Sequence, residues 1–198
     1  GCDPYSPENP VCIANGIFTG TPVPVGGKFG MADKSPMTGF IGDSLSGSWF
    51  SIALKRAGWD GIVIHNQSDS WVNVFIDDDH VEFLDATYLL GKGTYETEEA
   101  IREKLGDEQI RSCTIGPCGE HGVRFANVTN DGRQAGRTGH GSVWASKKLK
   151  ALSVRGTKGV RVYDPQTLMQ LSYDISKAAQ GEHTAKYRIY GTATGMKN

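Results

Sequence analysis

The sequence predicts an α+β fold, in which helices and strands are mixed without a regular alternation. Short apolar runs bounded by turn residues are typical of strands, and two longer segments have the apolar spacing of three and four residues that is typical of helices. The composition agrees, because 26 glycines, 8 prolines and 38% apolar residues in 198 describe a folded chain with many tight turns. This length suits one domain.

The expected strands share a short apolar run between turn residues, and in chain order they are residues 11–14, 61–65, 71–76, 80–84, 111–115, 123–129 and 149–155. The first two are expected to be buried. Residues 71–76 and 80–84 should pair as a hairpin, because three aspartates between them form a polar turn. Strands and helices do not alternate as in a regular βαβ fold, so a doubly wound domain is not expected.

Three helices are expected. Thr94 can cap a helix that runs to residue 105, with acidic side chains in its first turns, Gly106 at its end, and Ile101 and Leu105 toward a core. A second helix covers residues 165–179, where apolar side chains recur at spacings of three and four, and a shorter one covers residues 48–57.

Charge and cysteine content exclude several classes of function. The 21 basic and 22 acidic residues give a net charge of -1, so no overall field attracts a nucleic acid or an anionic membrane. No apolar run approaches the roughly 20 residues that span a bilayer. The four cysteines form neither a CxxC pair nor a zinc-like cluster, which fits a cytoplasmic protein. Cys113 and Cys118 are expected to be buried thiols, with a metal site or a disulfide as the alternatives.

The two ends of the chain indicate a larger protein. The sequence begins at Gly1 without a methionine and closes on a glycine-rich stretch at residues 190–198 that has no helix stop. Both ends are interpreted as edges at which further domains are missing.

Two glycine-containing segments are candidates for binding an anion. Residues 16–29 contain several glycines and Lys28, but they do not form a Walker A loop, and their residue chemistry alone favours an ordinary surface turn. In residues 35–50, a strand leading into a helix would place Leu45, Ser46 and Gly47 at the helix N-terminus, whose N–H groups bind anions. The alternative there is that the serines only cap the helix.

Residues 130–150 contain the strongest candidate. Arg133 and Arg137 flank a glycine-containing bend around Gly136, which suits a bidentate grip on phosphate beside exposed backbone donors. The glycines do not form the GxGxxG pattern of a dinucleotide site. The alternative for this segment is a solvated basic turn. His140 could donate a proton near a ligand, although a structural role is the more common one for a histidine in such a turn.

These segments resemble the opening domain of aldehyde:ferredoxin oxidoreductases. The matching motifs occur in the same order, and they are SPEN at 6–9, TGT at 19–21, KSPMTGF at 34–40, LKRAGWD at 54–60, DAT at 85–87, GKGTYETE at 91–98, IGP at 115–117 and GE at 119–120. Residues 130–150 are the most specific part, and the resemblance covers nearly all of residues 3–165.

The resemblance implies a pterin-binding N-terminal domain at residues 1–180, built from two β-sheets with flanking helices as the base for a bis-pterin cofactor. Residues 181–198 would then begin a connection to a missing helical domain. Two pterin-dithiolene molecules would chelate one tungsten or molybdenum atom, and a Mg²⁺ ion would bridge their phosphates. The implied cofactor-binding residues are Lys28, Leu45, Ser46, Gly47, Arg133, Gln134, Gly136 and Arg137. Backbone carbonyls of Leu45 and Gln134 would hold the Mg²⁺ ion.

The sequence departs from the family pattern at several of these positions. Lys28 stands where an arginine is typical, so the charge is kept but the planar two-point grip is not. Leu45 and Gln134 replace the usual asparagine and alanine. Thr138 and His140 replace a glycine and an apolar residue of the glycine-rich run. These departures indicate a divergent branch of the family.

By resemblance, the full protein would oxidise an aldehyde to a carboxylic acid and pass the electrons through a [4Fe-4S] cluster to ferredoxin or to an electron-transfer subunit. The cluster cysteines and the catalytic residues would lie in the missing C-terminal domains, and the protein could form a homodimer in an anaerobic cytoplasm. One alternative is an aromatic acyl-CoA ring reductase of the same superfamily. Another is a non-catalytic pterin-binding module.

Overall fold

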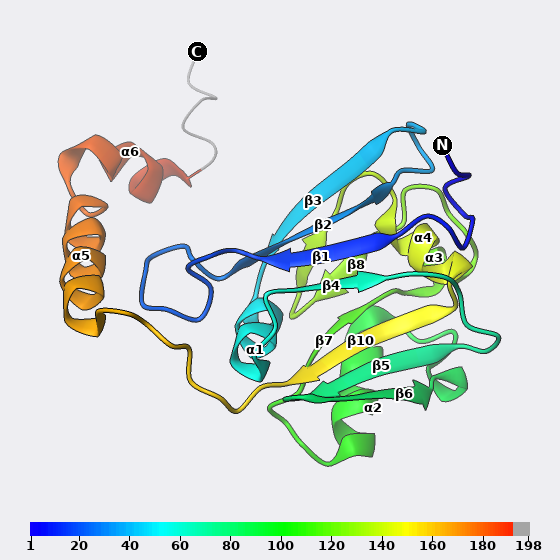
Figure 1. The fold of residues 1–198 in the computed structure, drawn as a ribbon. Coiled ribbons are helices and arrows are strands. Elements are labelled where there is room, and N and C mark those ends of the chain that lie inside the picture. Colours follow the sequence, from blue (N-terminus) through cyan, green and yellow to red (C-terminus); the bar gives the residue numbers. More distant parts are fainter. Residues whose placement is uncertain (192–198) are drawn as a thin grey trace.

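The computed structural model describes residues 1–191 and contains two β-sheets with flanking helices (Figure 1). The first sheet has the strand order β3-β2-β1-β4 and is antiparallel throughout. Its strands are β1 (Val11–Asn15), β2 (Lys28–Lys34), β3 (Ile41–Gly47) and β4 (Gly61–Ile64). The α+β fold with two sheets that the sequence predicts is therefore confirmed.

The second sheet has six strands in the order β6-β5-β10-β7-β8-β9. They are β5 (Val72–Asp77), β6 (His80–Asp85), β7 (Arg111–Thr114), β8 (Val128–Asn130), β9 (Arg133–Ala135) and β10 (Leu149–Arg155). Only β5 and β10 pair in parallel, and β5 with β6 forms the predicted hairpin. The sequence did not predict β2 and β9, which carry three of the candidate binding residues, Lys28, Arg133 and Gln134.

The main core lies between the two sheets. Alternate residues of one strand point to the same face, so Val11 and Ile13 of β1 join Phe29 of β2 in one buried cluster with Leu152 and Val154 of β10. Each of these side chains is at most 2% exposed, which makes the contact between the sheets the principal apolar contribution to stability.

Helices bury side chains in two apolar clusters. α1 (Trp49–Ala57) and α4 (His140–Ser146) add buried side chains to the cluster between the sheets. α2 (Thr94–Leu105) forms a second cluster, in which fully buried Ile101 packs with Ala151 of β10. The 3₁₀ turn η1 (Thr87–Leu89) belongs to this cluster, and the short α3 (Pro117–Glu120) lies against α4.

The last two helices stand to one side of the sheets in Figure 1. α5 (Pro165–Ala178) occupies nearly the predicted span, but its apolar residues Leu171 and Ile175 are 54% and 49% exposed rather than packed in the core. α6 (Glu182–Tyr190) lies in the segment expected to be only a connection. The remainder of that segment, residues 192–198, lies outside the described residues.

Two strand predictions need correction. Of the strand expected at 123–129, only the end exists, as β8, because Gly122 has φ +68° and the Val123 N–H donates to the Cys118 carbonyl, which makes a turn. The strand expected at 61–65 is present as β4 but is not buried, since Val63 is 55% exposed at the edge of its sheet.

Two helix starts also differ from the prediction. Leu45, Ser46 and Gly47 are the last residues of β3, not the N-terminus of α1, whose cap is Ser48. α2 is capped at Gly93 rather than at Thr94, because the Glu96 carboxylate accepts from the Gly93 N–H. Within residues 1–191, no helix is both long and apolar enough to cross a bilayer.

Candidate functional site

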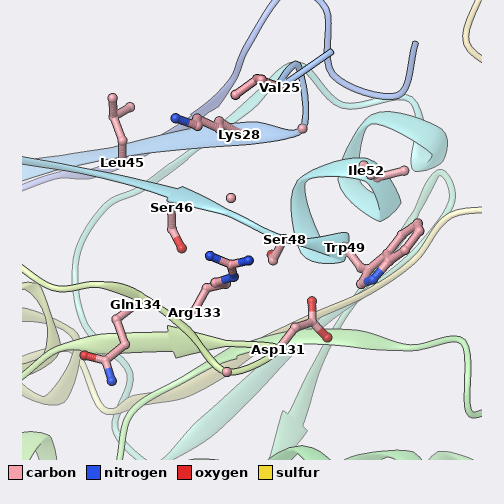
Figure 2. A pocket seen from close by; sticks show the side chains of 13 residues that line it. Val25, Lys28, Leu45, Ser46, Ser48, Trp49, Ile52, Asp131, Arg133 and Gln134 are labelled. Atoms are coloured by element: carbon pink, nitrogen blue, oxygen red, sulfur yellow. The ribbon is translucent and has the colours of Figure 1, made fainter. Parts of the chain in front are cut away.

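The outermost strands of the two sheets, β3 and β9, lie next to each other and enclose a cavity. The cavity measures about 890 Å³, in the range of sites for small organic ligands. Its walls come from β2, β3, the start of α1 and the turn into β9. In Figure 2, Arg133 rises from β9 toward Ser46 and Ser48, and Lys28 lies on the opposite wall.

A second cavity of about 550 Å³ adjoins the same two strands. Its lining residues are Asp43, Ser44, Leu45, Gln134, Gly136, Arg137 and Thr138. Leu45 and Gln134 line both cavities, so the meeting point of the two sheet edges separates one space from the other.

The structure brings all eight residues proposed from the sequence into these two cavities. Six of them line the larger cavity, and they are Lys28, Leu45, Ser46, Gly47, Arg133 and Gln134. Gly136 and Arg137 line the smaller one. The site therefore lies between the edges of two strands rather than at a helix N-terminus.

Serine and asparagine side chains hold the two sheet edges together. The Asn130 amide, fully buried in β8, donates to Ser46 Oγ on β3 at 3.1 Å. Ser44 Oγ accepts from the Arg137 N–H at 2.9 Å and also donates to the Arg137 carbonyl at 3.3 Å. Asn130 Oδ1 is buried without a hydrogen-bond partner, so the side chain that holds Ser46 also has an unused acceptor.

The bend at residues 136–140 is also fixed by a hydrogen bond to the first sheet. Thr138 has φ +63°, which is strained for a β-branched residue, and its carbonyl accepts from Ser35 Oγ at 2.7 Å. Gly139 follows with φ +85°, and a Cβ there would lie 1.9 Å from the Arg124 carbonyl oxygen. Only glycine fits at that position.

His140 forms a buried pair beneath the bend. Its Nδ1 lies 2.8 Å from Asp33 Oδ2, and both side chains are fully buried. Burial raises the pKa of Asp33, and the hydrogen bond to His140 acts in the opposite direction. His140 is the first residue of α4, and it lines neither of the two cavities.

A carboxylate pair supports the other end of β9. Asp131, with φ +44°, lines the larger cavity and accepts from the Phe50 N–H at the start of α1. Glu98 Oε1 on α2 accepts from the Asp131 N–H at 3.2 Å. Burial and the nearby Asp131 carboxylate raise the pKa of Glu98 to about 7. The sequence did not predict this pair, and the turn residues Asn130, Asp131 and Gly132 are the local signal that lies nearest to it.

The charges at the cavities favour an anionic ligand. Across residues 1–191, Lys28, Arg133 and Arg137 make no ion pair, so their charges are available to a ligand. Asp43 and Asp131 also line the cavities. In the same part of the chain, no group of three His, Cys, Asp or Glu side chains could hold a metal.

The cysteines lie away from these cavities. All four are free thiols, so the disulfide alternative for Cys113 and Cys118 is wrong. Cys113 is buried in β7 as expected, and burial raises the pKa of its thiol well above the ordinary value. Cys118 is exposed, contrary to the prediction, because it lies in the first turn of the short helix α3.

Comparisons with known proteins agree with this architecture. Residues 1–156 match the family model described as the N-terminal domain of aldehyde ferredoxin oxidoreductase. The chain is 49% identical over 194 residues to a tungsten-containing aldehyde ferredoxin oxidoreductase of Thermococcus kodakarensis and 46% identical to that of Pyrococcus furiosus. Each alignment covers 96% of this chain and 32% of the relative, so the chain spans about a third of their length.

Two further matches have different names. The WOR-like subunit of an aliphatic sulfonate oxidoreductase of Pyrococcus furiosus is 33% identical over 208 residues, covering 98% of this chain and 32% of that protein. Among solved structures, the active-site complex BamBC of benzoyl coenzyme A reductase with 1,5-dienoyl-CoA superposes with a TM-score of 0.88 at 34% identity. That match covers 90% of this chain and 27% of the other.

Proposed function

Because this chain belongs to the aldehyde ferredoxin oxidoreductase family, through that family's N-terminal domain, we propose that it binds a tungsten or molybdenum bis-pterin cofactor between its two sheets. The whole protein would oxidise an aldehyde to a carboxylic acid. The observation that carries the proposal is the pair of adjoining cavities that share Leu45 and Gln134. Two pterins joined by one metal need two adjoining spaces of this kind.

The residues at the cavities fit such a cofactor. Its phosphates are anionic, and Arg133 and Arg137 supply one unpaired guanidinium to each cavity, which can grip phosphate with two parallel N–H donors. Lys28 adds a single ammonium to the larger cavity. Gly47 lines the larger cavity and Gly136 the smaller one, and neither has a side chain that would keep a ligand from the backbone.

Leu45 and Gln134 would contribute through their backbone. We propose that their carbonyl oxygens hold a Mg²⁺ ion between the two pterin phosphates, since Mg²⁺ takes oxygen ligands and often binds through phosphates. Each residue lies on the outermost strand of its sheet, with a neighbouring strand on only one side. The Leu45 side chain is 69% exposed, so its identity places little constraint on the fold.

When bound, the cofactor supplies the two-electron redox chemistry that converts an aldehyde and water into a carboxylic acid. The role of this chain is to hold the cofactor in one orientation. Ser46, fixed by Asn130, and Arg137, fixed by Ser44, give the two cavities rigid walls. The cations would neutralise the phosphates and so set the electrostatic environment of the pterins.

The remaining parts of the proposed enzyme lie outside this chain. We propose that residues 1–180 are the pterin-binding domain and that later segments provide the [4Fe-4S] cluster and the substrate-contacting residues. Ferredoxin or an electron-transfer subunit would accept the electrons, and two copies could associate as a homodimer. The free thiols at all four cysteines fit a reducing cytoplasm.

One alternative has a specific observation in its favour. The structure superposes on a benzoyl coenzyme A reductase component with a TM-score of 0.88, so a ring reductase could use the same domain. The identity is 34% there, against 49% for an aldehyde oxidoreductase, which favours the aldehyde. Electron transfer from an aldehyde to ferredoxin, or reduction of an aromatic acyl-CoA, would distinguish the two. The absence of both activities in a metal-loaded protein would favour a non-catalytic pterin-binding module.

The proposed site is tested by replacing both arginines. In the anaerobically purified full-length protein, Arg133→Ala with Arg137→Ala should remove most of the bound pterin and metal while the protein remains folded. Tungsten and molybdenum are measured by plasma mass spectrometry, and pterin by the fluorescence of its oxidation product. Arg161→Ala is the matched control, because Arg161 is exposed and lines neither cavity. Unchanged pterin and metal in the double variant would refute the site.

A further inference from the structure

The bend that carries Arg137 rests on a buried pair that the proposed function does not use. We propose that Asp33 and His140 are positioning residues, which act through the hydroxyl of Thr138 to hold the Arg137 peptide at the smaller cavity. This inference rests on the proposed function, in which Arg137 binds a cofactor phosphate. Asp33 and His140 line neither cavity, and Thr138 lines only the smaller one.

The pair joins the two halves of the fold. Asp33 comes from β2 of the first sheet, and His140 begins the helix that follows β9 of the second. Asp33 Oδ2 and His140 Nδ1 are 2.8 Å apart, and neither side chain is exposed to solvent. Burying a carboxylate and an imidazole is costly unless each is paired, so removing either partner would leave an uncompensated polar group in the core.

The Thr138 hydroxyl lies within hydrogen-bond distance of both His140 and the Arg137 carbonyl. The Thr138 hydroxyl donates to the Arg137 carbonyl at 2.8 Å, and the same oxygen lies 3.2 Å from His140 Nε2. A hydroxyl has one hydrogen, so with that hydrogen on Arg137 it accepts one from Nε2. His140 Nδ1 faces the Asp33 side chain, so the two ring nitrogens join Asp33 to the Thr138 hydroxyl.

Thr138 therefore links the buried pair to the wall of the smaller cavity. If its hydroxyl donated to His140 instead, the Arg137 carbonyl would keep only the longer bond from Ser44, at 3.3 Å. The backbone at Thr138 has φ +63°, a strained conformation that the surrounding contacts must maintain. The chain of bonds from Asp33 to Arg137 is one of those contacts.

The test uses two substitutions at Thr138, one that removes the hydroxyl and one that keeps it. Thr138→Val keeps the β-branched shape and the backbone strain but removes the donor, whereas Thr138→Ser keeps the donor. In the full-length protein, we expect Thr138→Val to release pterin roughly threefold to tenfold faster during anaerobic dialysis, the effect of one lost hydrogen bond. Thr138→Ser should restore release to the wild-type rate.

Two further variants separate a positioning role from a purely structural one. With Arg137→Ala in place, Thr138→Val should cause no additional acceleration, because the guanidinium that Thr138 positions through the peptide has already been removed. Thermal unfolding of each variant in cofactor-free form shows that the fold is retained. Equal lowering of stability by valine and serine, with unchanged pterin release, would overturn the inference and assign Thr138 a structural role.

The outcomes also separate this inference from the proposed function. If Arg137→Ala accelerates pterin loss but Thr138→Val does not, the positioning role is refuted and the site stands. If Arg137→Ala itself leaves pterin release unchanged, the smaller cavity is not a cofactor site, and both proposals fail together.

Discussion

Replacing Glu98 with glutamine should stabilise the folded chain at pH 8 and change its stability little at pH 4. Glu98 is 5% exposed on α2, where Arg102 Nη1 is 3.9 Å from Oε2, too far for a hydrogen bond. Burial is the main cause of its raised pKa, and the Asp131 carboxylate adds to it. Glutamine can accept from the Asp131 N–H in the same way without carrying the charge.

The size of the effect follows from the pKa. Glu98 has a pKa of about 7 when folded, against an ordinary value of 4.5. Between these two values the unfolded chain has lost the proton and the folded chain has kept it, so stability falls as pH rises from 4.5 to 7. Each pKa unit is worth about 1.4 kcal/mol, so the full loss is about 3 kcal/mol. Above pH 7 it stays constant.

The assay is urea denaturation of wild type and Glu98→Gln at pH 4, 5, 6, 7 and 8. The difference in free energy of unfolding should grow with pH to about 3 kcal/mol in favour of glutamine. Glu99→Gln is the control, because the neighbouring Glu99 is exposed on the same helix and should give no such trend. A Glu98→Gln difference that is independent of pH would refute a neutral Glu98 at pH 6.

Two further predictions concern the bend and the thiols. Gly139→Ala should lower the free energy of unfolding by about 2 kcal/mol or more, since Gly139 has φ +85° and a Cβ would meet a backbone oxygen at 1.9 Å. Gly159→Ala, at an open position, serves as its control in urea denaturation, and equal stability of the two variants would contradict the argument. In the native protein, maleimide should label exposed Cys118 but not Cys113, whose pKa is raised by burial. Mass spectrometry of the digest checks this, and labelling of Cys113 before unfolding would contradict it.

Local elements of the fold were predictable because their signals are local. The helix ending at Gly106 and the hairpin around Asp78 were placed almost to the residue, since charge order, glycine and a polar turn act within a few positions. The prediction of a strand at residues 123–129 was wrong, because it too depended on local signals alone. Its apolar content suggested a strand, but the bond from Val123 back to Cys118 turns the chain there.

The interactions that support the site were not predictable from patterns along the chain. Asp33 and His140 come from different parts of the fold, and no spacing rule connects them. The same holds for Glu98 and Asp131, whose bond depends on α2 packing behind the second sheet. Each of these residues looks ordinary in the sequence, and only burial beside its partner gives it a distinct role.

The sequence by itself determined the α+β class and most of the elements, and through its motifs the family and the set of candidate binding residues, among them Arg133 and Arg137. Tertiary structure decided that β3 and β9 meet, so that Leu45 and Gln134 line both cavities. The physical reason is that the positions of sheet edges depend on how two apolar faces pack against each other. That packing is a sum of contacts between residues far apart in the chain, which no local pattern records.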